Sequence, residues 1–292
     1  MRALLMHNPT AGDGDDSKTR LCEGLKASGY EPVYFSTKEE AYKEAARTEK
    51  ADLIAIAGGD GTVSKVLCEV TDRRIPIAIL PAGTANNVAR SLNIEGAPEV
   101  LAARLADAPS AQLDIGIATG PWGERRFLEG IGFGAFAWHM EESSGGDTRE
   151  EKIAAGRQAL RDAIEAAEPE WFEIDVDGHK LVGDFLFVEV INIGCTGPGL
   201  TLSSEAQSGD KLLDIVYLPS ADREKMVAWL DREAPEAPIP LKRVQGNRVA
   251  VTTEGGTLRR DDNVWLQPEK AQIVRIAVED EPFRVLVPRA TG

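Results

Sequence analysis

One short run of small residues surrounds a carboxylate in the first third of the chain. At residues 58–62 the sequence reads GGDGT. Glycines let a backbone turn sharply and let its N–H groups approach an anion without interference from a Cβ atom. The apolar residues before this run predict a strand, and those after it predict a helix, whose first N–H groups attract a phosphate. The run therefore predicts a phosphate-binding turn.

Asp60 is the unusual member of this run. A carboxylate beside a phosphate is repulsive unless a cation or a proton transfer involves it. We therefore expect Asp60 to act with Mg²⁺ or in acid–base chemistry. The alternative is a tight turn in which Asp60 only caps the helix, and Thr62 is a further candidate for that cap.

A second loop, Pro-Ala-Gly-Thr at residues 81–84, repeats this design one strand later. Asn86 and Asn87 follow in the first turn of the next predicted helix. Their amides can donate to and accept from a nucleotide. A helix start with capping asparagines is the alternative.

The elements that position both loops show two hydrophobic patterns in alternation. Continuous apolar runs predict buried strands, and the segments between them have helical spacing. The expected strands are residues 3–7, 32–36, 52–57 and 75–80, and the expected helices are residues 19–28, 38–50, 63–70 and 85–92. This alternation indicates a doubly wound parallel sheet, in which ligands bind at the carboxyl ends of the strands. We therefore assign residues 1–115 to a nucleotide-binding α/β domain.

From about residue 116 the pattern changes to short alternating runs separated by turns. Asp177-Gly178 between two such runs is a strong signal for a type I′ hairpin turn. Helices are expected at residues 150–167 and 223–232, and residues 141–151 are a candidate for disorder. Residues 116–277 are therefore expected to form a mainly antiparallel β-sandwich domain.

The composition limits the partners and the location. Lys and Arg total 33 and Asp and Glu total 48, which gives a formal net charge of −15. This acidity argues against a nucleic-acid partner, since such binding needs Lys and Arg at the phosphates. The three cysteines form no CxxC pair, which argues against a disulfide framework or a zinc site. No run approaches the roughly 18 apolar residues of a membrane span, so we expect a cytoplasmic protein.

Other motifs for nucleotide binding or nucleophilic catalysis do not occur in the sequence. There is no GxxxxGK(S/T) of a P-loop, no GxGxxG that opens a helix, and no GxSxG nucleophile elbow. The two glycine loops therefore belong to a different type of site.

Five motifs in order along the chain resemble those of the diacylglycerol kinase catalytic family. They are NPTAG at 8–12, GGDGT at 58–62, PAGTAN at 81–86, LDIG at 113–116 and GDKLLD at 209–214. This family includes bacterial lipid kinases and sphingosine kinases, and its superfamily includes NAD kinases. The order of the motifs makes the resemblance specific.

The resemblance implies a two-domain kinase that uses ATP and Mg²⁺, with residues 278–292 completing the first domain and the second domain on the lipid side. It implies that an acidic residue takes the proton from a lipid hydroxyl, with Asp60 and Asp261 as candidates. The candidate metal ligands are Asp60, Asp114 and Asp210. The residues expected to bind the nucleotide are Asn8, Pro9, Gly58, Gly59, Asp60, Gly61, Thr62, Gly83, Thr84 and Asn86.

Three positions depart from the family pattern. Asn87 stands where the family usually has Asp, Asn263 stands where the spacing places its usual Glu, and Lys211 replaces a usual Gly. An amide cannot accept a proton as a carboxylate does. The two asparagines therefore motivate an alternative, a nucleotide-binding protein with weak or no kinase activity. Asp262 could substitute for the missing Glu if the loop shifts by one residue.

The function that we expect is an ATP- and Mg²⁺-dependent lipid kinase acting on a hydroxyl of diacylglycerol or a similar lipid. A kinase of a soluble substrate, similar to NAD kinase, is a second alternative. A lipid substrate requires peripheral contact with a membrane, for which an acidic protein needs a local basic patch. The tight basic pairs of the second domain are Arg125-Arg126, Lys242-Arg243 and Arg259-Arg260. An exposed edge strand would also allow a homo-oligomer.

Overall fold

The computed structural model of the chain describes residues 1–11, 16–137, 148–197, 200–232, 238–264 and 271–288. Gly12 of the first motif and most of the segment expected to be disordered lie outside these residues. The chain divides into two compact units, Met1–Asp114 with Asp280–Gly292 and Ile115–Glu279.

The first unit is built on a six-stranded sheet with the strand order β2-β1-β3-β4-β19-β5. Its strands are β1 (Arg2–His7), β2 (Glu31–Ser36), β3 (Leu53–Gly58), β4 (Ile77–Pro81), β5 (Ser110–Leu113) and β19 (Phe283–Leu286). Neighbouring strands are parallel except β19 and β5. The parallel sheet expected for this part of the chain is therefore confirmed.

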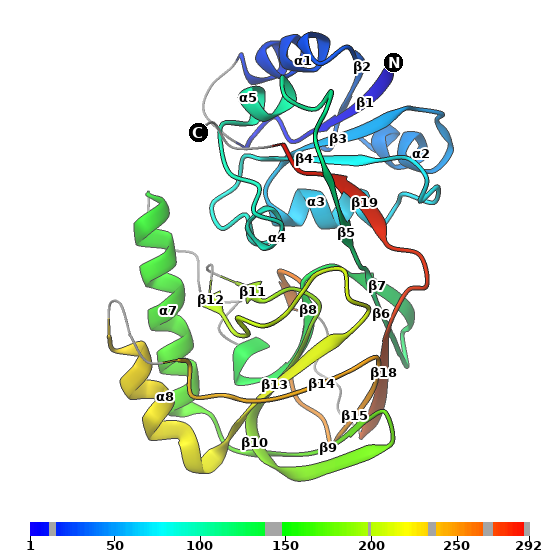
Figure 1. The fold of residues 1–292 in the computed structure, drawn as a ribbon. Helices are drawn as coiled ribbons and strands as arrows, with labels where there is room; N and C mark the ends of the chain where they lie inside the picture. Colours follow the sequence, from blue (N-terminus) through cyan, green and yellow to red (C-terminus); the bar gives the residue numbers. More distant parts are fainter. Residues whose placement is uncertain (12–15, 138–147, 198–199, 233–237, 265–270, 289–292) are drawn as a thin grey trace. The chain divides into compact units, whose positions relative to one another are not determined.

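Helices cover both faces of this sheet, with α1 and α5 on one face and α3 and α4 on the other (Figure 1). The helices are α1 (Ser17–Ala27), α2 (Ala41–Thr48), α3 (Asp60–Leu67), α4 (Asn87–Ser91) and α5 (Pro98–Ala102). This cover explains why β3 is buried along its whole length, as a strand of continuous apolar residues should be. The short α5 was not expected from the sequence, and the Ser28 hydroxyl next to α1 donates to its Ala102 carbonyl at 2.7 Å.

The helix after the first glycine loop begins three residues earlier than expected, at Asp60. Its N-cap is Gly59, and no side chain caps it. The prediction that Thr62 caps this helix is therefore wrong. Thr62 lies inside the first turn, where its backbone N–H donates to the Gly59 carbonyl at 2.9 Å.

The second unit contains an eleven-stranded sheet with the order β17-β16-β8-β10-β9-β15-β18-β6-β7, in which β13 joins β10 to β14. Every strand pair in it is antiparallel. Its strands are β6 (Gly116–Gly120), β7 (Gly123–Phe127), β8 (Gly130–Gly134), β9 (Glu170–Val176), β10 (His179–Ile191), β13 (Leu213–Pro219), β14 (Lys242–Gly246), β15 (Arg248–Thr253), β16 (Leu258–Arg260), β17 (Asn263–Val264) and β18 (Gln272–Val278). The mainly antiparallel second domain is confirmed.

One apolar core joins strands from both ends of this sheet, so the sheet folds back on itself around that core. A separate pair, β11 (Cys195–Thr196) and β12 (Leu200–Thr201), forms a small hairpin. The hairpin turn expected at Asp177-Gly178 is confirmed. Both residues have positive φ, 51° and 88°, and they join β9 to β10.

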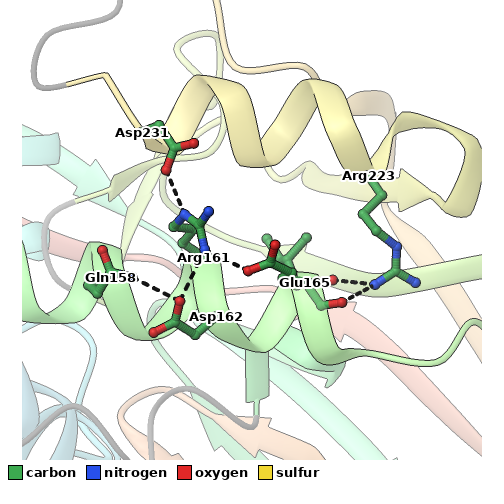
Figure 2. Close-up of polar contacts among 7 residues, drawn as sticks. Gln158, Arg161, Asp162, Glu165, Arg223 and Asp231 are labelled. Carbon is green, nitrogen blue, oxygen red and sulfur yellow. Dashed lines mark hydrogen bonds and ion pairs between the residues drawn. The ribbon is translucent and has the colours of Figure 1, made fainter.

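Two helices, α7 (Arg149–Ala166) and α8 (Arg223–Leu230), pack together beside the sheet, and α8 follows the 3₁₀ turn η1 (Ser220–Asp222). Figure 2 shows their polar contacts. Arg161 of α7 donates to Asp231 at 2.5 Å, and Arg223 of α8 donates to the last carbonyls of α7, including that of Glu165 at 2.9 Å. Thr148 and Glu151 form a capping box at the start of α7.

Candidate functional site

Three expected binding motifs converge because β1, β3 and β4 are neighbours and run in the same direction. Asn8 and Pro9 follow β1, the GGDGT run follows and ends β3, and Gly83 to Asn86 follow β4. All ten residues expected to bind the nucleotide therefore lie at one edge of the sheet, at the carboxyl ends of the strands. This is the edge where open α/β sheets bind ligands.

Asn8 connects the first motif to the second. Its backbone N–H donates to the Ala57 carbonyl of β3 at 2.9 Å. Its side-chain Nδ2 lies 3.4 Å from the Thr62 hydroxyl. Its Oδ1 accepts from both the N–H and the hydroxyl of Thr10, at 3.2 and 2.9 Å. Asn8 is thus held on both sides, and its position relative to α3 is fixed.

The two glycine loops touch through their backbones. A Cβ atom added to Gly59 would lie 3.1 Å from the Cα of Gly83, and one added to Gly83 would lie closer than 3.0 Å to the Cα of Gly59. The Gly58 carbonyl also accepts from the Ala82 N–H at 3.0 Å. The glycines are therefore required for contact between the loops, in addition to any role toward a phosphate.

Asn86 shapes the second loop from within. It is in the left-handed conformation, with φ at 52°. Its Oδ1 accepts from the Gly83 N–H and its Nδ2 donates to the Gly83 carbonyl, both at 2.9 Å. Asn is among the few residues that adopt this conformation readily. Asn86 is the N-cap residue of α4, but its side chain closes the loop on itself and makes no capping hydrogen bond to the helix.

Asp60 lies at the centre of this arrangement and is 9% exposed. Its Oδ1 accepts from the Val88 N–H at 3.0 Å, and its carboxylate also accepts from the N–H groups of Asn86 and Asn87 at the start of α4. Burial raises the pKa of Asp60, and these backbone donors oppose that rise. The result is a buried carboxylate that is more basic than an ordinary Asp, placed where both loops meet.

Three further binding candidates, Pro9, Gly61 and Thr84, lie in the same loops and are at least partly exposed. They therefore remain reachable by a ligand. Asn87, which stands at the family's usual Asp position, is 1% exposed. Its backbone N–H faces the Asp60 carboxylate, and its side chain carries no charge.

Asp114 lies at the opposite end of the strands from Asp60. Leu113 of β5 pairs with Phe283 of β19. Two residues further along β19, Val285 pairs with Ile77, the first residue of β4. Gly58 of β3 pairs with Pro81, the last residue of β4. Along the strand direction, Leu113 and Gly58 are therefore six residue steps of roughly 3.3 Å apart, which is about 20 Å. Metal–oxygen bonds of roughly 2 Å cannot span that separation. Asp60 and Asp114 therefore cannot hold one metal ion together, and the role of each as a metal ligand stays a prediction.

Asp261 lies in the second unit and is 4% exposed, with φ at 48°. Its Oδ1 accepts from the N–H groups of Leu128, Glu129 and Gly130, at 3.0, 2.8 and 3.3 Å. Such contacts give the carboxylate a structural role, because they hold the turn before β8. The role of Asp261 as a catalytic base stays a prediction.

Asp210 lies in a turn of the second unit, where its Oδ1 accepts from the Leu212 N–H at 2.9 Å and Gln245 Nε2 lies 3.4 Å from its Oδ2. Lys211 beside it has φ at 61°, a conformation that favours glycine. This explains why diacylglycerol kinases usually have Gly at the position of Lys211. No group of three or more His, Cys, Asp or Glu suited to a metal ion occurs among the residues that the structure describes.

The sequence analysis missed a buried polar network in the second unit. Arg259 is fully buried and donates to both carboxylate oxygens of Glu189, at 3.0 and 2.5 Å. It also donates to the Thr196 hydroxyl at 2.9 Å, and that hydroxyl donates to Glu129 at 3.1 Å. The available signal was the presence of charged residues inside otherwise apolar strand patterns.

Three members of the basic pairs considered for membrane contact form ion pairs inside the second unit. Arg259 pairs with Glu189, Arg243 with Asp214 and Glu205, and Arg126 with Glu279. Asn263, at the position of the usual Glu, is exposed on β17. Among the described residues, no helix has the length and apolar character needed to cross a membrane.

The fold of the chain resembles that of solved kinases. The structure resembles an NAD kinase from Archaeoglobus fulgidus solved in complex with ATP, with a TM-score of 0.57 and 16% identity over 98% of this chain and 93% of that one. It also resembles a diacylglycerol kinase from Bacillus anthracis, with a TM-score of 0.73 and 21% identity over 100% and 98% of the two chains.

Residues 2–118 match the family model described as diacylglycerol kinase catalytic domain. A diacylglycerol kinase of Bacillus subtilis is 26% identical over 240 residues, which cover 77% of this chain and 76% of that protein. The chain is thus similar to diacylglycerol kinases, and its residues 2–118 are similar to their catalytic domain. These similarities support a phosphotransferase.

Proposed function

We propose that the protein is an ATP- and Mg²⁺-dependent lipid kinase that phosphorylates a hydroxyl group of diacylglycerol or a similar lipid. The observation that carries this proposal is the meeting of the two glycine loops around the buried carboxylate of Asp60. Support for the substrate class comes from relatives named diacylglycerol kinase in Bacillus subtilis and Mycobacterium tuberculosis.

The residues of the first unit fit a nucleotide. The backbone N–H groups of the glycine loops, Asn8 and the exposed parts of Thr84 supply donors at the carboxyl end of the sheet, where a phosphate chain binds. A Cβ atom on Gly59 or Gly83 would occupy this junction. Phosphoryl transfer depends mainly on such positioning and on charge neutralisation.

Asp60 has two possible tasks at this junction, and the donor chemistry suits both. Mg²⁺ is commonly held by one or two carboxylates together with substrate phosphates, so Asp60 alone could supply the protein ligand. Bound Mg²⁺ would neutralise the charge that develops on the phosphates. A buried carboxylate with a raised pKa is also suited to take the proton of an acceptor hydroxyl. Asp261 remains the second candidate for that proton transfer.

An assay with labelled ATP and Mg²⁺ tests the proposal. The acceptors are diacylglycerol, sphingosine, ceramide, phosphatidylglycerol and NAD, the lipids being presented in vesicles. We expect label in a lipid with wild-type protein, none with Asp60→Asn, and wild-type activity with the control Asp107→Asn, whose side chain is exposed in the same unit. Transfer to NAD alone would indicate a kinase of a soluble substrate.

The asparagines at positions 87 and 263 favour a second candidate, a nucleotide-binding protein of the same family without transfer activity. Saturable ATP binding by wild-type protein with no labelled product on any acceptor would support it. If the wild-type protein lacks transfer activity because position 263 has no carboxylate, Asn263→Glu should restore phosphoryl transfer. Unchanged turnover in Asp60→Asn would remove Asp60 from the mechanism.

A further inference from the structure

A buried histidine stands directly before the first binding motif. His7 is the last residue of β1 and is 1% exposed. Its backbone carbonyl accepts from the N–H and the hydroxyl of Thr37, at 2.9 and 3.3 Å. The next residue is Asn8, which reaches Thr62 in the GGDGT run. Any change in the position of His7 is therefore transmitted directly to a residue of the proposed nucleotide site.

Both ring nitrogens of His7 contact hydroxyl groups. Its Nδ1 lies 3.3 Å from the Tyr34 hydroxyl on β2, and its Nε2 lies 3.4 Å from the Ser17 hydroxyl at the start of α1. A neutral imidazole has one donor and one acceptor nitrogen, and a hydroxyl can serve either. The ring thus connects the end of β1 to two other elements, α1 and β2.

The surroundings favour the neutral ring. Burial lowers the pKa of His7, and the positive charge of Lys18 on α1 lowers it further. Lys18 is itself held over the Tyr34 ring, with its Nζ 4.0 Å from the ring centre. A protonated ring could only donate, so Ser17 and Tyr34 would both have to act as acceptors beside a second cation.

The Ser17 contact has a particular consequence for the chain between β1 and α1. Residues 9–16 join Asn8 to Ser17. His7 is adjacent to one end of this connection in sequence and contacts the other end through its Nε2. One side chain therefore sets the separation of the two ends.

We propose that His7 is a positioning residue for nucleotide binding, which acts by joining the Asn8 end of β1 to the Ser17 end of α1. The inference rests on the proposed function, because the ligand whose affinity it sets is ATP. His7 itself does not contact the nucleotide; it fixes Asn8, which does.

Two conservative variants separate the contacts of the ring. The side-chain nitrogen of Gln reaches the place of imidazole Nε2, so His7→Gln keeps the Ser17 contact. That of Asn reaches the place of Nδ1, so His7→Asn keeps the Tyr34 contact and loses Ser17. Ser17→Ala removes the contact between Ser17 and His7 by deleting the hydroxyl. Tyr34→Phe is the matched control, because it deletes the hydroxyl that contacts the other ring nitrogen.

The readouts are the Kd for a fluorescent ATP analogue, the KM for ATP, kcat at saturating ATP, and hydrogen exchange of the Asn8 and Ala11 amides. We expect His7→Asn and Ser17→Ala to raise Kd and KM about 3- to 10-fold, the range for loss of one hydrogen bond, with kcat nearly unchanged. Exchange at Asn8 and Ala11 should quicken in both. His7→Gln and Tyr34→Phe should resemble wild type, and the double variant of His7→Asn with Ser17→Ala should be no weaker than either single variant.

The proposal is overturned if His7→Asn and Ser17→Ala bind the analogue as wild type does, or if His7→Gln is as impaired as His7→Asn. A fall in kcat with unchanged KM would also overturn it. If wild-type protein binds no ATP, the proposed function fails separately, and unchanged amide exchange in His7→Asn still refutes the positioning role.

Discussion

The contact between the two glycine loops makes a graded prediction for Gly83→Ala and Gly59→Ala. The added Cβ atom at position 83 would lie closer than 3.0 Å to the Gly59 Cα and 2.9 Å from Asn86 Oδ1. The added Cβ at position 59 would lie 3.1 Å from the Gly83 Cα. Carbon atoms pack best at roughly 3.5–4.0 Å. The first substitution must therefore push two backbones apart by at least half an ångström, whereas the second needs a smaller adjustment.

The magnitudes follow from two opposing effects. Overpacking costs about 1–3 kcal/mol. Replacing Gly by Ala also restricts the unfolded chain, which stabilises the fold by about 0.4–1 kcal/mol. We expect Gly83→Ala to lower the free energy of unfolding of the first unit by about 1–2 kcal/mol. For Gly59→Ala the two effects nearly cancel. Because displacement at a site by about 1 Å can cost 100-fold in function, Gly83→Ala should weaken ATP binding at least 10-fold.

The assay must distinguish the two units. The five tryptophans all follow residue 116, so their fluorescence during urea unfolding reports the second unit and should not change. Hydrogen exchange of the β3 and β4 amides reports the first unit, and titration with an ATP analogue reports the site. The argument is refuted if Gly59→Ala is the more damaging change, or if Gly83→Ala keeps wild-type exchange and ATP affinity.

Two further predictions concern the second unit. Arg259→Met leaves the Glu189 carboxylate buried without its cation, so tryptophan-detected urea unfolding should show that the free energy of unfolding falls by about 3–5 kcal/mol. Adding Glu189→Leu should recover part of this loss. Strictly additive effects in the double variant would contradict the pairing. Lys211→Gly relieves the positive φ of 61° and should stabilise the unit by roughly 0.5–1 kcal/mol. The control Lys225→Gly, within α8, should destabilise by about 1 kcal/mol, and equal effects at both positions would refute the conformational argument.

Much of the first unit could be predicted because its signals are local. Continuous apolar runs mark β1, β3 and β4, and the glycine loops follow them directly in sequence. Parallel strands must present their carboxyl ends at one edge, so the gathering of Asn8, Asp60 and Gly83 follows from the alternation of strands and helices. The turn at Asp177-Gly178 was equally local, because its residue types allow the positive φ that the turn requires.

Other features depend on partners that are distant in the chain. The separation of Asp114 from Asp60 is fixed by the pairing of β5 with β19 and of β19 with β4, and no residue near Asp114 encodes that register. Likewise, Asp261 looks like a free acidic residue in sequence, yet its carboxylate is engaged by the N–H groups of residues 128–130. Spacing along the chain could not reveal either fact.

The sequence by itself therefore determined the fold class, the resemblance to diacylglycerol kinases and the residues of the glycine loops, because periodicity and glycine placement act over a few residues. Tertiary structure alone decided the surroundings of each carboxylate. Burial raises the pKa of Asp60, the strand register removes Asp114 from its neighbourhood, and backbone donors occupy Asp261. It also gave His7 its contacts, since Tyr34 and Ser17 reach that ring only after β2 and α1 pack against β1. Charge and hydrogen bonding depend on distance in space, which a sequence does not state.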